Sequence, residues 1–144
     1  MIAHCQIPCG IYGDMTQIDL LREDIATVEK SMKQIVDLSK EPAANMNQIV
    51  RWINNKEEHC GNIQEKVASY WMTQRIKPAA PSDEAAYRKY TAQITTLHAM
   101  LVSAMKAKQT TDLAHVEDLR KQVDALAGSY FSKEDLEHLK THAR

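Results

Sequence analysis

The sequence predicts an all-α protein: an antiparallel up-and-down four-helix bundle with an irregular N-terminal hook and a short C-terminal helix. Apolar residues recur every three or four positions along four long stretches. The connections between these stretches are short, and no stretch alternates between apolar and polar residues as a half-buried strand does. At 144 residues, the chain is long enough to bury one hydrophobic core.

The first predicted helix begins at Asp14, whose carboxylate can cap the first turn. Apolar residues then follow steps of three and four over about three heptads, on one side of a charged helix. The helix should fade near Leu38 and stop before Pro42. The predicted buried stripe consists of Ile18, Leu21, Ile25, Val28, Met32 and Ile35.

The second predicted helix extends from about Asn45 to about Trp71. One position of its apolar repeat holds a charged residue, Lys56. Gly61 weakens the helix locally. Pro78, Pro81 and Ser82 are turn signals that end this region. The predicted stripe consists of Met46, Ile49, Ile53, Cys60, Ile63, Val67 and Tyr70.

The third predicted helix starts where Ser82 is followed by two acidic residues, and it breaks near Gln109. Its predicted stripe consists of Tyr87, Tyr90, Ile94, Leu97, Leu101 and Ala104. The fourth helix should stop near Gly128, and Ser132 with Asp135 forms a capping pattern that opens the short tail helix. The stripe of the fourth helix consists of Leu113, Val116, Leu119, Val123 and Leu126.

Composition narrows the possible functions. The net charge is −1 with charges of both signs well mixed, which gives no support for binding to nucleic acid or to a membrane surface. No apolar run is long enough to span a bilayer. Cys60, an odd third cysteine among polar residues, most simply fills space in the core, and a reducing, cytoplasmic setting is the default expectation.

The N-terminal hook concentrates ligand chemistry, because His4, Cys5 and Cys9 are strong metal ligands within six residues. A helix is disfavoured here because Pro8 lies between the two cysteines, and Gly10 permits backbone angles that other residues avoid. The segment should therefore curl and bring both sulfur atoms towards one point.

Two thiolates with nitrogen donors suit several metals. Structural zinc sites usually take four side chains, and only three are visible here. Ni(II) prefers a square plane and can use backbone nitrogens. If the chain were cut after Ala3, the α-amine of His4, the amide of Cys5 and both thiolates would form a planar set of two nitrogens and two sulfurs. The imidazole of His4 could then approach axially, which gives a one-electron redox centre.

The run from His4 to Tyr12, H-C-Q-I-P-C-G-I-Y, resembles the nickel hook of the nickel superoxide dismutases, H-C-x-x-P-C-G-x-Y. Every family position in these nine residues is filled, although some members have Asp where this chain has Gln6. The resemblance implies that His4, Cys5 and Cys9 bind nickel and that Tyr12 lies over the open face of the metal as a catalytic residue. It also implies a four-helix bundle.

Weaker likenesses extend beyond the hook. Asp19 resembles the acidic position on the first helix that orients the axial imidazole in the family, with Asp in place of Glu. Lys77 resembles the lysine of the family's Lys-Pro stretch, where positive charge near the entrance attracts the superoxide anion. Lys56 either snorkels from the bundle edge or meets the hook or its acidic neighbour, in the same subunit or across subunits.

The resemblance implies a superoxide dismutase with one nickel ion per subunit, which alternates between Ni(II) and Ni(III) and converts superoxide into dioxygen and hydrogen peroxide. The family forms homohexamers that shelter the oxidation-sensitive thiolates, and we expect the same assembly here. We expect residues 1–3 to be a removed leader remnant, residues 4–12 the hook and residues 14–144 the bundle. Expected partners are superoxide, a processing protease and a nickel-delivery factor.

Two other interpretations are compatible with the residues alone. One is a non-catalytic carrier or sensor, in which the uncut hook captures nickel, zinc or copper through two thiolates and His4 without turnover. The presence of Met1, Ile2 and Ala3 before the hook favours this alternative. The other is a purely structural bundle with a disulfide between Cys5 and Cys9.

Overall fold

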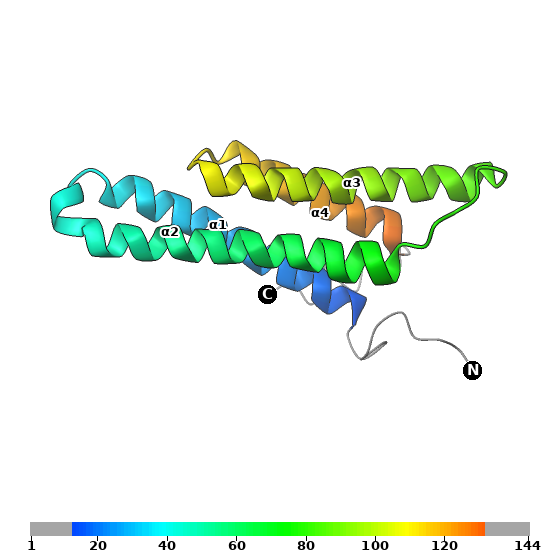
Figure 1. The fold of residues 1–144 in the computed structure, drawn as a ribbon, viewed down its shortest axis with the longest axis horizontal. Coiled ribbons are helices and arrows are strands. Elements are labelled where there is room, and N and C mark those ends of the chain that lie inside the picture. Colours follow the sequence, from blue (N-terminus) through cyan, green and yellow to red (C-terminus); the bar gives the residue numbers. More distant parts are fainter. Residues whose placement is uncertain (1–12, 132–144) are drawn as a thin grey trace.

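The computed structural model describes residues 13–131, and every regular element in that range is a helix. The predicted antiparallel four-helix bundle is confirmed, with α1 facing α4 and α2 facing α3 (Figure 1). The predicted tail helix after Ser132 lies outside the described residues. The first hairpin consists of α1 (Asp14–Leu38) and α2 (Pro42–Glu65), which continues into the π-helix η1 (Lys66–Arg75); the second consists of α3 (Glu84–Gln109) and α4 (Ala114–Tyr130).

The helix boundaries agree with the sequence pattern for α1 and for the end of α3 at Gln109, and they differ for α2. α1 ends at Leu38 as predicted, but α2 already begins at Pro42, because proline is well suited to the first helical position, where no N–H donor is needed. Helical backbone then continues past Trp71 as far as Arg75. In α3 the cap is Asp83, whose side chain accepts a hydrogen bond from the amide of Ala86.

The core lies along the bundle axis and is built from all four helices and η1. Every predicted stripe residue of α1 is buried, as are four of the five predicted for α4. The exception in α4 is Leu113, which precedes the helix and is exposed. Large side chains with less than 2% exposure include Trp71, Ile18, Leu21, Ile25, Met32, Ile63, Leu97, Met100, Leu119 and Leu126.

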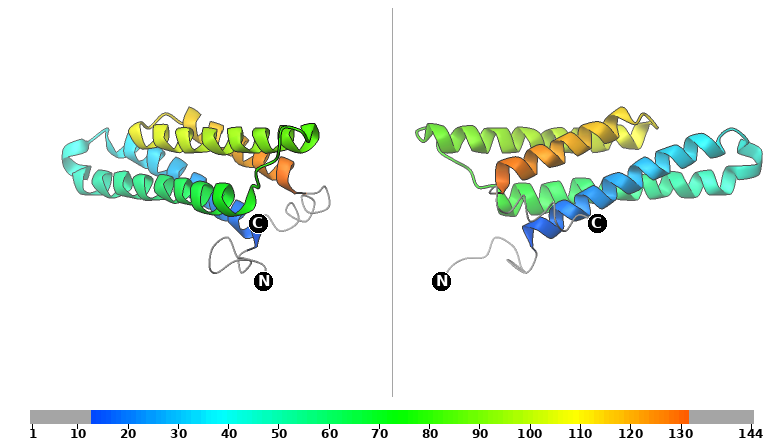
Figure 2. Two further views of the ribbon diagram at one scale, coloured as in Figure 1. Left: turned by 45° about the vertical axis from the view of Figure 1, so that its right-hand side comes forward. Right: turned by 180° about the vertical axis from the view of Figure 1, so that it is seen from behind.

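The two hairpins are staggered, and each extends past the other at one end (Figures 1 and 2). Lys56 marks one limit, because its Nζ donates to the carbonyls of Ala107, in the last turn of α3, and of Thr110, which follows α3. The part of α2 before Lys56 therefore continues beyond α3. Met46 and Ile53, predicted to be buried, are therefore 56% and 39% exposed. The overhang of the first hairpin also exposes Val36 and Val50.

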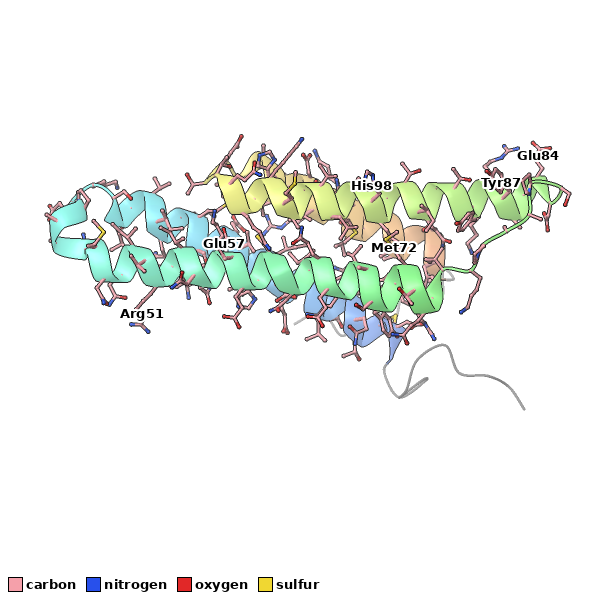
Figure 3. All side chains as sticks on the ribbon, viewed as in Figure 1. Arg51, Glu57, Met72, Glu84, Tyr87 and His98 are labelled. Carbon is pink, nitrogen blue, oxygen red and sulfur yellow. The ribbon has the colours of Figure 1, made fainter. Side chains whose placement is uncertain are left out.

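The other overhang is the N-terminal end of α3, which extends past the ends of η1 and α4 (Figure 2). Tyr87, predicted to be buried, is 40% exposed there and lies beside Glu84 (Figure 3). The buried face of α3 is also rotated from the predicted stripe. Leu97 and Ala104 are buried as expected, whereas Tyr90, Ile94 and Leu101 pack only at the core's edge; the other buried positions are Gln93, Met100, Ser103 and Ala107.

This rotation is possible because the polar side chains on the buried face of α3 have partners. Gln93 donates to the carbonyl of Ser129, and the hydroxyl of Ser103 accepts a hydrogen bond from Gln122.

Among the described helices, none combines the length and the apolar character that a membrane span requires.

Candidate functional site

The predicted nickel ligands and Tyr12 lie outside the residues that the structure describes, so their arrangement is not tested by it. The described chain begins at Gly13, directly after the hook, and enters α1 at Asp14. The end of the bundle around Asp14 is therefore the part of the described structure that adjoins the hook. The C-terminal end of η1 and the end of α4 lie at this same end (Figure 1).

Asp14 joins three elements through its carboxylate. The guanidinium of Arg75 donates to Oδ2 across 2.5 Å, and the hydroxyl of Tyr130 donates to the same oxygen across 2.7 Å. The hydroxyl of Tyr70 donates to Oδ1. We call these four residues the Asp14 network. The N-cap of α1 is Gly13, which makes no side-chain cap bond, so the prediction that Asp14 caps the helix is wrong: its carboxylate is used across the bundle instead.

The π-helical backbone of η1 brings Tyr70 and Arg75 to the same carboxylate. These residues are five positions apart, and in an α-helix they would diverge by about 140°. In η1 the turns are wider: Ile76 donates from its amide to the carbonyl of Trp71 across 2.9 Å, and the hydroxyl of Thr73 reaches the carbonyl of Ala68 across 2.7 Å. The regular helical period predicted for this stretch does not include such a wide turn.

Aromatic packing holds the two tyrosine hydroxyls in place. The fully buried ring of Trp71 makes edge-to-face contacts with Tyr70, at 5.4 Å between ring centroids, and with Tyr130, at 5.1 Å. The Arg75 guanidinium lies 5.6 Å from the centroid of the Tyr70 ring. Two buried donors here, Nε1 of Trp71 and Nε of Arg75, have no acceptor among residues 13–131.

The electrostatics of the network favour a charged carboxylate. Burial by itself raises the pKa of Asp14, but hydrogen bonds from Arg75, Tyr70 and Tyr130 outweigh it and hold the pKa below 3.8. Burial and the neighbouring Asp14 raise the pKa values of both tyrosine hydroxyls above their usual 10.0. At neutral pH, Asp14 is therefore an anion and both tyrosines are neutral hydrogen-bond donors.

Asp19 and Lys77, to which the resemblance gives supporting roles, are exposed at this end of the bundle. Asp19 lies in the second turn of α1, and its carboxylate is 3.6 Å from the guanidinium of Arg22, which also binds Asp124. Lys77 follows the end of η1 by two residues and lies near the Asp14 network in sequence. The structure does not bring Asp19 and Lys77 into contact with each other.

Lys56, the third residue considered for a supporting role, lies away from this end. Its Nζ donates to the carbonyls of Ala107 across 2.9 Å and Thr110 across 3.0 Å, and it also binds the carbonyl of Lys108. Its neighbour Asn55 bonds to Ser31, and the helical rise from Asp14 to Ser31 is roughly 25 Å. Within one chain, Lys56 is therefore buried and does not meet Asp19, whereas its alternative contacts with the hook or across subunits stay predictions.

A second buried polar cluster lies between α1 and the junction of α2 with η1. Asp24, with its side chain 8% exposed, accepts hydrogen bonds from Lys66 across 2.9 Å and pairs with Nδ1 of His59 across 2.7 Å. The seven-residue spacing of His59 and Lys66 places them on one face of a helix, a signal that sequence reasoning missed. Because both partners bind the carboxylate of Asp24, this charged residue is tolerated on the buried face of α1.

Among residues 13–131 no group of three His, Cys, Asp or Glu side chains is placed to hold a metal ion. Cys60 is a free, buried thiol whose pKa is raised to about 11, chiefly by burial. In a comparison with protein families, the model of the family described as nickel-containing superoxide dismutase matches residues 1–134. Neither the curated proteins nor the solved structures include a match to this chain.

Proposed function

The chain belongs to the family of nickel-containing superoxide dismutases, and we propose that His4, Cys5 and Cys9 hold its nickel ion. The enzyme converts superoxide into dioxygen and hydrogen peroxide, and nickel is its cofactor. The observation that carries the ligand assignment is the complete hook pattern within the matched residues. Neither the described structure nor the family match supports the alternative of a non-catalytic metal carrier.

The donor set of the hook fits nickel. Two thiolates with nitrogen donors suit the square-planar preference of Ni(II), and the thiolates bring its potential within reach of superoxide. When bound, nickel supplies the one-electron steps by alternating between its divalent and trivalent states. The imidazole of His4 would be a further nitrogen donor to the bound nickel and would support its trivalent state.

Three further residues have proposed roles towards the substrate and the ligands. Tyr12 orders superoxide or water above the open face of the site through its hydroxyl group. Asp19, exposed near the start of α1, accepts a hydrogen bond from the His4 imidazole in place of the family's Glu. Lys77 attracts superoxide electrostatically, and its exposure at the hook end supports this role. We leave Lys56 out of the site because carbonyl groups already bind its ammonium.

The full donor set requires cleavage before His4. With Met1, Ile2 and Ala3 attached, the nitrogen of His4 is an amide and not a primary amine. Removal of these residues by a protease frees the α-amine as a ligand, and a nickel-delivery factor then loads the site. The small residue Ala3 is compatible with such a cleavage. A reducing cytoplasm, the expected compartment, would protect the thiols before loading.

The assembled enzyme is proposed to be a homohexamer. The staggered hairpins support association, because the overhang of the first hairpin exposes Val36, Met46, Val50 and Ile53 between about 39% and 56%. Covering these side chains with a second copy would remove apolar surface from water. Assembly would also shelter thiolates that are vulnerable beside an oxidant.

The ligand assignment can be tested by counting bound nickel in cysteine variants of the chain that begins at His4. We expect Cys5→Ser and Cys9→Ser each to abolish stoichiometric nickel binding and dismutation. Cys60→Ser is the matched control, because Cys60 is a buried free thiol in α2 and is not part of the hook sequence, and this variant should retain both. Full nickel binding by Cys5→Ser or Cys9→Ser would show that the assignment is wrong.

A further inference from the structure

We propose that the outer face of α3 joins two copies of this chain in an antiparallel helix pair, whose twofold axis passes between Lys89 and Tyr90. This inference goes beyond the proposed function, since it depends neither on the hook nor on nickel. The contact is also distinct from the overhang of the first hairpin. A closed hexamer that contains twofold axes needs more than one kind of contact between its chains.

The proposed contact surface lies on the side of α3 that faces away from the core. Gln93, Leu97 and Met100 are buried in the bundle, and at 100° per residue Glu84 and Thr95 lie roughly 180° around the helix from them. The surface is exposed and is hollowed over about 560 Å³. The residues that line the hollow, which we call the outer α3 patch, are Glu84, Tyr87, Arg88, Thr91, Ala92 and Thr95.

The spacing of the patch is that of an antiparallel coiled-coil seam. Glu84, Arg88, Thr91 and Thr95 follow one another in steps of four, three and four. The proposed axis places Glu84 level with Thr95 of the second copy, and it places Arg88 level with Thr91 of the second copy. Because the axis is twofold, each of these pairs occurs twice in the contact.

Side-chain sizes are complementary across this contact. Each long side chain of the seam lies level with a short threonine, so the two helices can approach closely. On one flank, Tyr87 reaches Ile94 of the second copy, an apolar residue that is only partly buried at the edge of its own core. On the other flank, Ala85 and Ala92 present only methyl groups. Association therefore covers the ring of Tyr87, which is 40% exposed in a single chain (Figure 3).

The polar groups of the patch are compatible with self-association. Arg88 pairs with Glu84 of its own helix across 2.5 Å, so the patch carries no net charge and two copies of it do not repel each other. The hydroxyl of Thr91 donates to the carbonyl of Tyr87 across 2.8 Å, and its oxygen can still accept a hydrogen bond from Arg88 of the second copy. The patch is thus complementary to itself, which identifies a second copy as its occupant.

The test introduces charges of either sign at the two exposed threonines of the seam in the nickel-loaded protein. Thr91 lies level with Arg88, so Thr91→Glu should lower the dissociation constant of the contact about three- to tenfold, and Thr91→Arg should raise it by a similar factor. Thr95 lies level with Glu84, so the signs are reversed: Thr95→Arg should strengthen the contact and Thr95→Glu should weaken it. Sedimentation equilibrium measures the four dissociation constants against that of the unmodified chain.

The two positions control for each other. They are four residues apart on one face of α3, so an effect of net charge alone would have the same sign at both. Equal signs at Thr91 and Thr95, or unchanged dissociation constants in all four variants, would refute the antiparallel contact.

Cross-linking gives an independent readout. In this arrangement the Cα atoms of the two copies of Lys89 lie about 12 Å apart, within reach of an amine-reactive cross-linker. A peptide that is linked to itself through Lys89 must come from two different chains. We expect this product from the unmodified chain and from Thr91→Glu, and a clear loss of it in Thr91→Arg. Its absence from the unmodified chain would refute the contact.

The failure of this inference can be told apart from the failure of the proposed function. Lack of bound nickel or of dismutation in the unmodified chain would refute the proposed function. It would leave the signs of the four threonine variants and the Lys89 product as they are, because neither readout involves the metal.

Discussion

The guanidinium of Arg75, the last residue of η1, donates to the carboxylate of Asp14, the first residue of α1, across 2.5 Å. The two side chains are 28% and 16% exposed, so water screens this ion pair only in part. The contact joins the C-terminal end of η1 to the N-terminal end of α1, which follows the hook in the sequence. It also depends on the wide turns of η1, since an α-helix would not direct both Tyr70 and Arg75 to one carboxylate.

Replacement of Arg75 by alanine should lower the free energy of unfolding by about 2–3 kcal/mol, because a partly buried carboxylate loses its charged donor. Urea denaturation measures this change. Arg75→Lys should recover only part of the loss, since an ammonium group cannot reproduce the geometry of the guanidinium. A control, Arg88→Ala, removes an exposed pair with Glu84 and should change stability by less than about 0.5 kcal/mol. Equal effects of the two alanine variants would contradict this prediction.

Acid should weaken the bundle through Asp14. The pKa of this carboxyl group is lowered in the folded state, so its contribution to stability is fully present above the ordinary value of 3.8. The contribution is lost as the pH falls below 3.8 and through the folded-state pKa, because protonation removes the charge that Arg75 binds. The difference in unfolding free energy between the unmodified chain and Asp14→Asn should therefore shrink below about pH 4. If this difference in unfolding free energy stayed constant over the roughly four pH units from pH 2 to pH 6, the lowered pKa of Asp14 would be contradicted.

Lys56 should contribute to stability and not to catalysis. Lys56→Met removes the donor for the carbonyls of Ala107, Lys108 and Thr110, and should cost about 2–3 kcal/mol in unfolding free energy. The exposed Lys33→Met, which breaks a surface pair with Glu29, is the control and should cost less than about 0.5 kcal/mol. Activity per bound nickel should be unchanged in both variants. A selective loss of activity in Lys56→Met would restore Lys56 to the site.

Lys77 should accelerate the encounter with superoxide. Lys77→Glu is expected to lower the second-order rate constant about two- to threefold at low ionic strength, and salt should remove most of the difference. Pulse radiolysis at several salt concentrations measures it. Lys40→Glu makes the same change of charge at the far end of the first hairpin, where the lysine is 74% exposed, and should have a smaller effect. Equal effects would indicate that only the net charge matters.

The overhang of the first hairpin should lie in a contact between copies. Val50→Glu places a charge within this exposed apolar surface and should shift the assembly towards smaller species in analytical ultracentrifugation. Arg51→Glu, a larger change of charge on a different face of α2, should leave the assembly intact (Figure 3). An unchanged sedimentation coefficient for Val50→Glu would show that this surface does not contribute to the oligomer.

Local patterns predicted the fold well wherever helices face a continuous core. The stripe from Ile18 to Ile35 and the helix end at Leu38 are correct, because this face of α1 is apolar without interruption. The pattern failed for α3, where Gln93 and Ser103 are buried with polar partners on α4. It also failed for Met46 and Tyr87, because the stagger of the two hairpins is a tertiary property that no helical period encodes.

The candidate site was predictable only in its local part. The hook pattern from His4 to Tyr12 is contiguous, so its chemistry can be read from the sequence. The Asp14 network instead joins residues 56 and 116 positions apart through the wide turns of η1. Asp14 also has the sequence features of an ordinary helix cap, and neither Tyr70 nor Tyr130 differs in sequence from a packing aromatic.

The most direct test of the proposed centre is superoxide dismutation by the nickel-loaded chain that begins at His4, compared with the chain that begins at Met1. Intact mass should confirm each N-terminus, and both proteins should be assayed at equal concentration. We expect activity only in the chain that begins at His4, because only that chain has the α-amine as a ligand. Equal activity in both chains would contradict the requirement for the amine, and nickel bound without activity in either would contradict the proposed centre.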